Sequence, residues 1–163
     1  MININLPDHV TYAKIKEVDS KTKEKSTRQM PLFMGDDSVK GEVEIRLNEV
    51  RKMEHLGIKI ELIGQIDVTN EKVISSNFMS LGNDLEPSGT LHDDKVYQFK
   101  FDYFQKPYES YYGAEAKLRY ILRCTIQRGK LSKNIVKELD IAVYTFRRPD
   151  KEDVPIQMDV SQS

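Results

Sequence analysis

The most informative segment of this chain is residues 106–127, KPYESYYGAEAKLRYILRCTIQ. From Glu115 onward, apolar and polar side chains alternate with a period of two, and Ile121 is the one break in the pattern. Because successive side chains of a β-strand point to opposite faces, the segment predicts a long, half-buried strand. The predicted inward residues are Ala116, Leu118, Tyr120, Leu122, Cys124 and Ile126, and the predicted outward residues are Lys117, Arg119, Arg123, Thr125 and Gln127.

Other segments of the chain alternate in the same way. They are residues 12–18, 42–47, 58–62 and 97–103, with a further pair at Ile141 and Val143. Turn-forming residues separate them at 35–38, 68–70, 86–89 and 128–129, and the lysine-rich segment 19–28 also predicts a turn. Many short strands with regular turns predict an all-β fold, an antiparallel β-sandwich. Residues 75–85 fit either a short helix or a strand, and the pattern leaves both open.

Composition narrows the classes of function. A chain of 163 residues with 39% hydrophobic residues can form one domain with one packed core. Its net charge of −1 argues against a nucleic-acid-binding protein and against attachment to anionic lipid by net charge alone. The single cysteine suits a reducing cytosol. With no apolar run of membrane-spanning length and no signal-peptide core in MININLPDHV, we expect a soluble, cytosolic protein.

The sequence carries no constellation typical of catalysis or metal binding. The three histidines lie tens of residues apart, so we expect a structural role for His55. Cys124 falls on the apolar face of its strand, which favours a small buried hydrophobe over a nucleophile. The acidic pairs at 36–37 and 93–94 lack the spaced ligands of a calcium site and are expected in solvated turns. We therefore predict no enzyme, no cofactor and no metal.

Three surface features have a functional and a structural interpretation. The lysines at 14, 16, 21, 23 and 25, with Arg28, could touch phosphoinositide headgroups, but the interleaved Glu17, Asp19 and Glu24 favour a solvated hairpin tip. The aromatic stripe Tyr97–Tyr103 could stack bases, but core packing is the favoured role. Tyr108, Tyr111 and Tyr112 cluster in a predicted loop, where they either bind a partner or cover the end of the sandwich.

Three blocks of the sequence resemble one known family. The segment 106–122 contains Lys-Pro-Tyr-Glu-Ser-Tyr, a glycine and then Leu-Arg-Tyr-Ile-Leu. Residues 54–66 read EHLGIKIELIGQI, and Ile-Val-Lys-Glu at 135–138 is followed by Asp140 and Val143. In the same order, these blocks are similar to those of the vacuolar-protein-sorting twenty-six family, the arrestin-like subunit of the retromer coat.

The resemblance implies a fold and a domain organisation. It implies that residues 1–148 form an arrestin-like (immunoglobulin-like) N-terminal lobe, and that residues 149–163 form a linker toward a second lobe that lies outside this chain. It also implies a non-enzymatic coat subunit that returns transmembrane cargo from endosomes, located peripherally on their cytosolic face. The implied partners are the retromer α-solenoid subunit, held mainly by the second lobe, sorting nexins and cargo tails.

The resemblance also implies a partner-binding site. In the family, the turn before the 39–47 strand contributes to a sorting-nexin face, together with the end of the last strand near Phe146. That turn usually reads Asp-Gly-Glu-Ser, whereas here it is Gly35-Asp36-Asp37-Ser38, so its acidic position is displaced. We expect partner contacts at Met34, Gly35, Asp36, Asp37 and Phe146, with Tyr108, Tyr111 and Tyr112 as the next candidates.

Two other functions remain as alternatives. A retriever-type subunit or a general arrestin-domain adaptor would share the fold, although the block at 54–66 favours the retromer family. A lipid- or ligand-binding sandwich would need a pocket between the sheets, and only the aromatic stripe at 97–103 supports it.

Overall fold

The computed structural model describes residues 1–19, 21–102 and 108–144, and in these ranges every regular element is a β-strand. The strands are β1 (Ile2–Asn5), β2 (Tyr12–Val18), β3 (Lys25–Phe33), β4 (Val39–Ile45), β5 (Met53–Thr69), β6 (Val73–Leu91), β7 (Lys95–Phe101), β8 (Tyr111–Tyr112), β9 (Ala116–Gln127) and β10 (Ile135–Val143). The predicted all-β class is confirmed.

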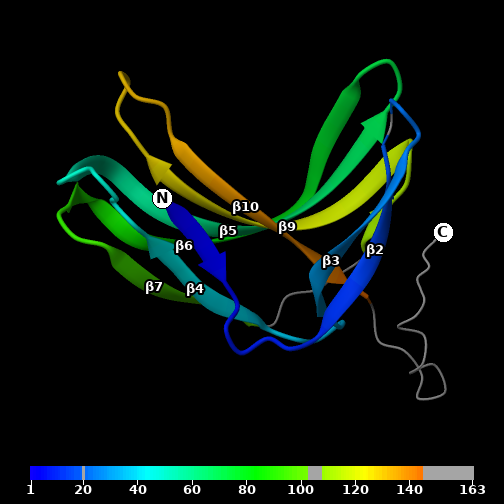
Figure 1. Ribbon diagram of the computed structural model, residues 1–163, viewed down its shortest axis with the longest axis horizontal. Helices are drawn as coiled ribbons and strands as arrows, with labels where there is room; N and C mark the ends of the chain where they lie inside the picture. The colour runs from blue at the N-terminus through cyan, green and yellow to red at the C-terminus, as the bar shows by residue number, and fades with distance from the viewer. Residues whose placement is uncertain (20, 103–107, 145–163) are drawn as a thin grey trace.

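The strands form two sheets that pack face to face. The smaller sheet has the order β1-β4-β7, and the larger has the order β2-β3-β10-β9-β5-β6, with β8 paired to β9. Figure 1 shows the larger sheet strongly curved, with β4 and β7 lying along one half of it. Each sheet buries one apolar face against the other, and this burial removes the apolar side chains from water. The predicted sandwich is confirmed.

Strand β9, which the alternation at 115–127 predicted, lies inside the larger sheet between β10 and β5. It pairs with β5 along its whole length and with β10 over residues 120–126. Tyr120, Leu122, Cys124 and Ile126 are fully buried, at 0% exposure. Their predicted inward orientation is confirmed, while Ala116 and Leu118 are half-buried because they lie toward the end of the strand.

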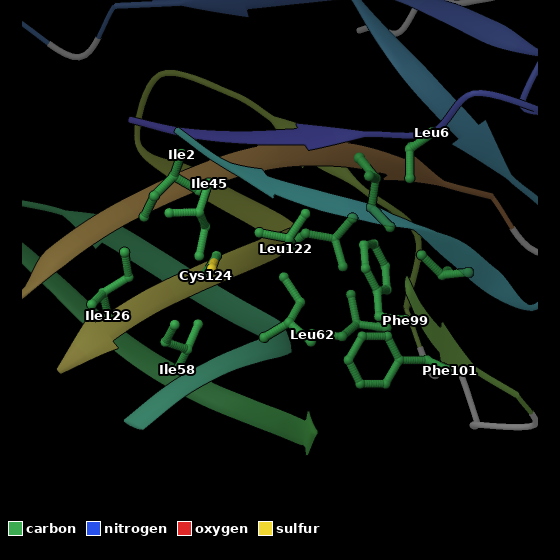
Figure 2. Close-up of a cluster of buried hydrophobic side chains, with 14 of the residues drawn as sticks. Ile2, Leu6, Ile45, Ile58, Leu62, Phe99, Phe101, Leu122, Cys124 and Ile126 are labelled. Atoms are coloured by element: carbon green, nitrogen blue, oxygen red, sulfur yellow. The ribbon is translucent and has the colours of Figure 1, made fainter. Parts of the chain in front are cut away.

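The main core fills the space between the two sheets. Figure 2 shows Ile45, Phe99 and Phe101 of the smaller sheet close to Leu62, Leu122 and Cys124 of the larger one. Two rings of the aromatic stripe, Phe99 and Phe101, are 5% exposed, which confirms their predicted core position. Each such side chain contributes about 1.5–3 kcal/mol when removed from water, so this layer supplies much of the stability of the fold.

The outer face of β9 differs from the solvated cationic surface that alternation predicted. Ile121 is 1% exposed and lies opposite Ile63 of β5, which is also buried. Thr125 is buried too, and Arg119 retains only 23% of its side-chain exposure. The predicted exposure of this face is therefore wrong in part, because alternation shows which face a residue is on but not what covers that face.

A second, smaller core lies on the outer face of the larger sheet and covers part of it. It contains Ile15, Met30, Tyr112 and Ala142, which come from β2, β3, β8 and β10. The pairing of β3 with β10 is parallel, with Ala142 opposite Leu32, whereas the other paired strands are antiparallel. The β2–β3 hairpin is thereby joined to the larger sheet, an arrangement that the sequence did not reveal.

Strand β6 resolves one open prediction and corrects another. Residues 75–85 are strand, and the turn expected at 86–89 is wrong because these residues continue β6. The pairing shifts by one residue between Ile58 and Lys59, which marks a β-bulge in β6 at Leu85. Since β6 is an edge strand, the missing N–H of Pro87 does not interrupt the sheet.

Two strand boundaries near the N-terminus also differ from the prediction. Residues 2–5 form β1, which alternation did not identify, and β3 begins at Lys25 inside the segment expected to be a turn. The turn at 35–38 and the turn after β9 are found where expected. Tyr103, Phe146 and the expected linker at 149–163 lie outside the described residues.

Candidate partner-binding surface

The end of β10 brings the two predicted contact segments together. On one side, the Val143 amide donates a hydrogen bond to the Ser110 hydroxyl at 2.9 Å, and the Ser110 amide donates to the Val143 carbonyl at 2.8 Å. On the other side, the Tyr144 amide donates to the Phe33 carbonyl at 3.0 Å. Since successive residues of a strand direct their backbone groups to opposite edges, the segments at 34–37 and 108–112 flank one strand end.

The turn at 34–37 is closed by an acidic side chain. The Met34 amide donates to Asp37 Oδ2 at 2.8 Å, and the Asp37 amide donates back to the Met34 carbonyl at 3.2 Å. Such a side-chain bond to the backbone is the usual reason for aspartate in a tight turn. Asp36 and Asp37 are exposed and Met34 and Gly35 are half-buried, so the turn presents carboxylates beside a small apolar area.

The three tyrosines do not form one surface cluster. Tyr108 and Tyr111 are 49% and 55% exposed, but Tyr112 is 5% exposed and belongs to the second core. The Tyr120 hydroxyl holds the backbone of Tyr108, donating to its carbonyl at 2.6 Å. The expected loop is wrong for Tyr111 and Tyr112, which form β8, and this leaves Tyr108 and Tyr111 as the accessible members.

A polar network lies behind this surface, where β10 separates from β9 and joins β3. Asp140, with 8% of its side chain exposed, accepts hydrogen bonds from Arg119 at 3.1 and 3.0 Å. It also accepts from Arg28 Nη2 at 3.1 Å and from the Tyr112 hydroxyl at 2.8 Å. Four strands thus meet at one carboxylate. Arg119 further approaches Asp67 at 3.4 Å.

The charges of this network stabilise one another. Burial alone would raise the pKa of Asp140, but the hydrogen bonds and positive charge of Arg119, with Tyr112 and Arg28, hold it below its ordinary value. Burial and the nearby Asp140 carboxylate raise the pKa of Tyr112 far above its ordinary value. At neutral pH the Asp140 carboxylate is therefore ionised and the Tyr112 hydroxyl stays protonated and donates to it, which orients β8 against β10.

Sequence reasoning missed this network for a clear reason. Alternation placed Arg119 on the outer face of β9, where an exposed side chain was expected. The one available signal was Asp140 itself, a charged residue directly before the apolar run Ile141-Ala142-Val143. A carboxylate next to a buried run needs a cationic partner, but alternation could not say which arginine supplies it.

Neither of the reactive-looking side chains is placed for chemistry. Cys124 is 0% exposed, as predicted, and burial raises the pKa of its thiol to about 12. His55 is 4% exposed, and neither ring nitrogen has a hydrogen-bond partner among the described residues. No group of three His, Cys, Asp or Glu side chains gathers as metal ligands within residues 1–19, 21–102 and 108–144.

A hollow of about 430 Å³ lies next to the turn at 34–37. Its lining includes His9 and Phe33, whose rings stack with centroids 4.3 Å apart, and the side chains of Lys40 and Lys100. These two lysines lie opposite each other on β4 and β7. Charged walls of this kind do not resemble the mostly apolar pocket of a lipid carrier.

Among the described residues, no helix has the length and apolar character of a membrane span.

The fold and the surface at the end of β10 define an arrestin-like β-sandwich with an exposed acidic turn and two accessible tyrosines. The sequence profile of the family described as vacuolar protein sorting-associated protein 26 matches residues 1–162. The chain belongs to this family.

Curated relatives agree with the family assignment. The chain is 40% identical over 138 residues to vacuolar protein sorting-associated protein 26 of Plasmodium falciparum, covering 85% of this chain and 46% of the relative. It is 40% identical over 130 residues to the protein of the same name from Schizosaccharomyces pombe, covering 80% and 43%. With the human protein 26B it shares 38% over 146 residues, covering 89% and 43%. The chain thus spans less than half the length of these relatives.

One solved structure supports the fold alone. The sporulation control protein Spo0M of Bacillus subtilis superimposes with a TM-score of 0.52, at 12% identity, over 83% of this chain and 49% of that protein. At this identity the likeness carries no information about function.

Proposed function

We propose that this chain is the first arrestin-like lobe, over residues 1–148, of a non-enzymatic retromer coat subunit that retrieves transmembrane cargo from endosomes. The observation that carries the proposal is the family match over residues 1–162. In this proposal, residues 149–163 lead toward a second lobe, which grips the α-solenoid subunit. Sorting nexins and cargo tails are the other partners, and they hold the subunit on the cytosolic face of endosomes.

The surface at the end of β10 is suited to the sorting-nexin contact. Asp36 and Asp37 are exposed on a turn that is closed by hydrogen bonds, and Tyr108 and Tyr111 are exposed on the other side of the strand end. Preformed carboxylates beside tyrosines suit a basic peptide or hairpin, because tyrosine adds contact area at a low entropic cost. Phe146, also expected in this site, lies outside the described residues.

The binding test should change Asp36 and spare Asp37, whose carboxylate closes the turn. Asp36→Lys is expected to weaken binding of a sorting nexin at least tenfold, measured by isothermal titration, because a repulsive charge replaces an attractive one. Asp93→Lys is the matched control, since Asp93 is an exposed aspartate in a different turn. Equal affinity of the two variants would move the site to Tyr108 and Tyr111.

The proposed role of the second lobe has its own test. The solenoid subunit should bind a two-lobed natural chain far more tightly than residues 1–163 alone. Equal affinity would refute this division of labour. A retriever-type adaptor would instead bind the corresponding retriever subunits in the same pull-down.

A further inference from the structure

The β2–β3 hairpin separates its charges onto two faces. Lys14 pairs with Gln29, Lys16 with Thr27 and Val18 with Lys25, so these positions alternate onto one face. The intervening positions, with buried Ile15 and half-buried Glu17, form the face that packs on the larger sheet. Lys14, Lys16 and Lys25 therefore share the outer face, which has no carboxylate between its strands. We call this the outer lysine face.

Two of the three acidic residues of the hairpin, Glu17 and Asp19, form contacts away from the outer lysine face, and the third, Glu24, is exposed in the turn. Glu17 accepts from Lys117 Nζ at 2.6 Å and from Arg28 Nε at 3.2 Å, both on the inner side. Asp19 Oδ1 accepts from the Lys21 and Thr22 amides, each at 2.8 Å, and so closes the turn. Between β2 and β3 the outer lysine face therefore carries no carboxylate, whereas in the turn the charges of Asp19 and Glu24 offset part of the positive charge.

The lysines of the turn extend the outer lysine face. Lys21 and Lys23 lie between β2 and β3, and both are exposed, as are Lys14, Lys16 and Lys25. Among the described residues, no ion pair engages any of these five lysines. Figure 1 shows this turn projecting at the upper right, at the opposite end of β3 from the turn at 34–37.

The composition of this surface indicates its partner. Lysine is depleted in protein–protein interfaces, where aromatic residues and arginine are the anchors that contribute most of the binding energy. Arginine also binds a carboxylate better than lysine does, because its planar guanidinium donates two parallel hydrogen bonds. Arg28, the one arginine of the hairpin, lies opposite Ile15 and so belongs to the inner face. There it forms ion pairs with Glu17 and Asp140. Clusters of four to eight lysines without such anchors are typical of contacts with anionic lipid.

We infer that the outer lysine face binds the anionic headgroups of a lipid bilayer directly. This contact goes beyond the proposed function, in which partners alone hold the subunit on the membrane, and it does not depend on which partner binds near Asp36. Each lysine close to an anionic bilayer adds a small, salt-sensitive attraction, so the five together give a weak contact that supports the partners.

The test is sedimentation of the chain with vesicles of phosphatidylcholine containing about 30% phosphatidylserine, in the range that carries a surface potential. Binding should occur at low salt, fall steeply toward about 0.5 M salt, and be absent with pure phosphatidylcholine. The triple variant Lys14→Gln, Lys16→Gln, Lys25→Gln should lower the partition coefficient about a hundredfold, from the attraction expected per lysine.

A matched variant separates this surface from overall charge. Lys52→Gln, Lys95→Gln, Lys137→Gln removes the same charge from exposed positions outside the hairpin, and should change partition by about twofold at most. Equal loss in both triple variants would overturn the inference. It would also be overturned if the unmodified chain failed to sediment with anionic vesicles, or bound polyglutamate in preference to them, which would indicate an acidic protein partner.

Discussion

Arg119 grips Asp140 with two hydrogen bonds, from Nε at 3.1 Å to one carboxylate oxygen and from Nη2 at 3.0 Å to the other. A two-point contact of this kind fixes both the distance and the orientation of the two groups. It connects β9 with β10 just where β10 leaves β9 to pair with β3. The pair therefore lies at the point where the pairing of β10 changes from β9 to β3.

The first prediction concerns removal of one partner of this pair. Arg119→Ala should lower the free energy of unfolding by about 2–4 kcal/mol, because it leaves a nearly buried carboxylate short of its main partner. Urea denaturation would measure the loss. Arg46→Ala is the control, since Arg46 forms an exposed pair with Glu44 and should cost about 0–1 kcal/mol. Equal costs would show that the network adds no more than a surface ion pair.

The second prediction concerns acid. Because the folded-state pKa of Asp140 is depressed, its contribution to stability is present above the unfolded-state pKa of about 3.9 and is lost as the pH falls through the lower folded-state pKa. Asp67 acts in the same direction: burial would raise its pKa, but hydrogen bonds from Gln65 and Ser75 lower it. The urea concentration at the midpoint of unfolding should therefore decrease when the pH is lowered below about 4.

Asp140→Asn identifies the source of this acid sensitivity. The variant should be less stable at pH 7, and its midpoint should fall less steeply than that of the unmodified chain below about pH 4, since one titrating group is gone. Parallel curves for the two proteins would assign the acid sensitivity to other carboxylates.

The third prediction concerns the core face of β9. Leu122→Ala should cost about 2–5 kcal/mol, because it opens a cavity between the two sheets. The Cys124 thiol, buried and with its pKa raised to about 12, should react slowly with a thiol reagent until denaturant is added. Equal reaction rates in the folded and unfolded states would contradict the register of this strand.

The fourth prediction concerns a glycine that the sandwich needs for close approach. At Gly41, a Cβ atom would overlap the backbone carbonyl of Asn5 and lie 2.6 Å from a methyl group of Leu6. Gly41→Ala should therefore cost about 1–3 kcal/mol, as strain or as displacement of β1. Gly129→Ala is the control, because a Cβ there meets nothing within 4 Å. A thermal melt in which both variants match the unmodified chain would refute the close packing of β1 on β4.

The local features of this protein could be predicted from its sequence. Alternation identified β9, its inward residues Leu122 and Cys124, and the aromatic core positions Phe99 and Phe101, because side-chain direction in a strand depends only on neighbouring residues. It failed for β6, where a bulge at Leu85 breaks the period of two. Three sequence blocks also indicated the family to which the chain belongs.

The contacts between residues far apart in the sequence could not be predicted and depend on the order of the strands in the sheet. Arg28 and Asp140 are 112 positions apart, and they touch because β3 adds to the edge of β10 in parallel. The same pairing brings Phe33 and the turn that follows it to the end of β10. The order of strands in a sheet depends on which faces can be buried together, and no local pattern of residues records that choice.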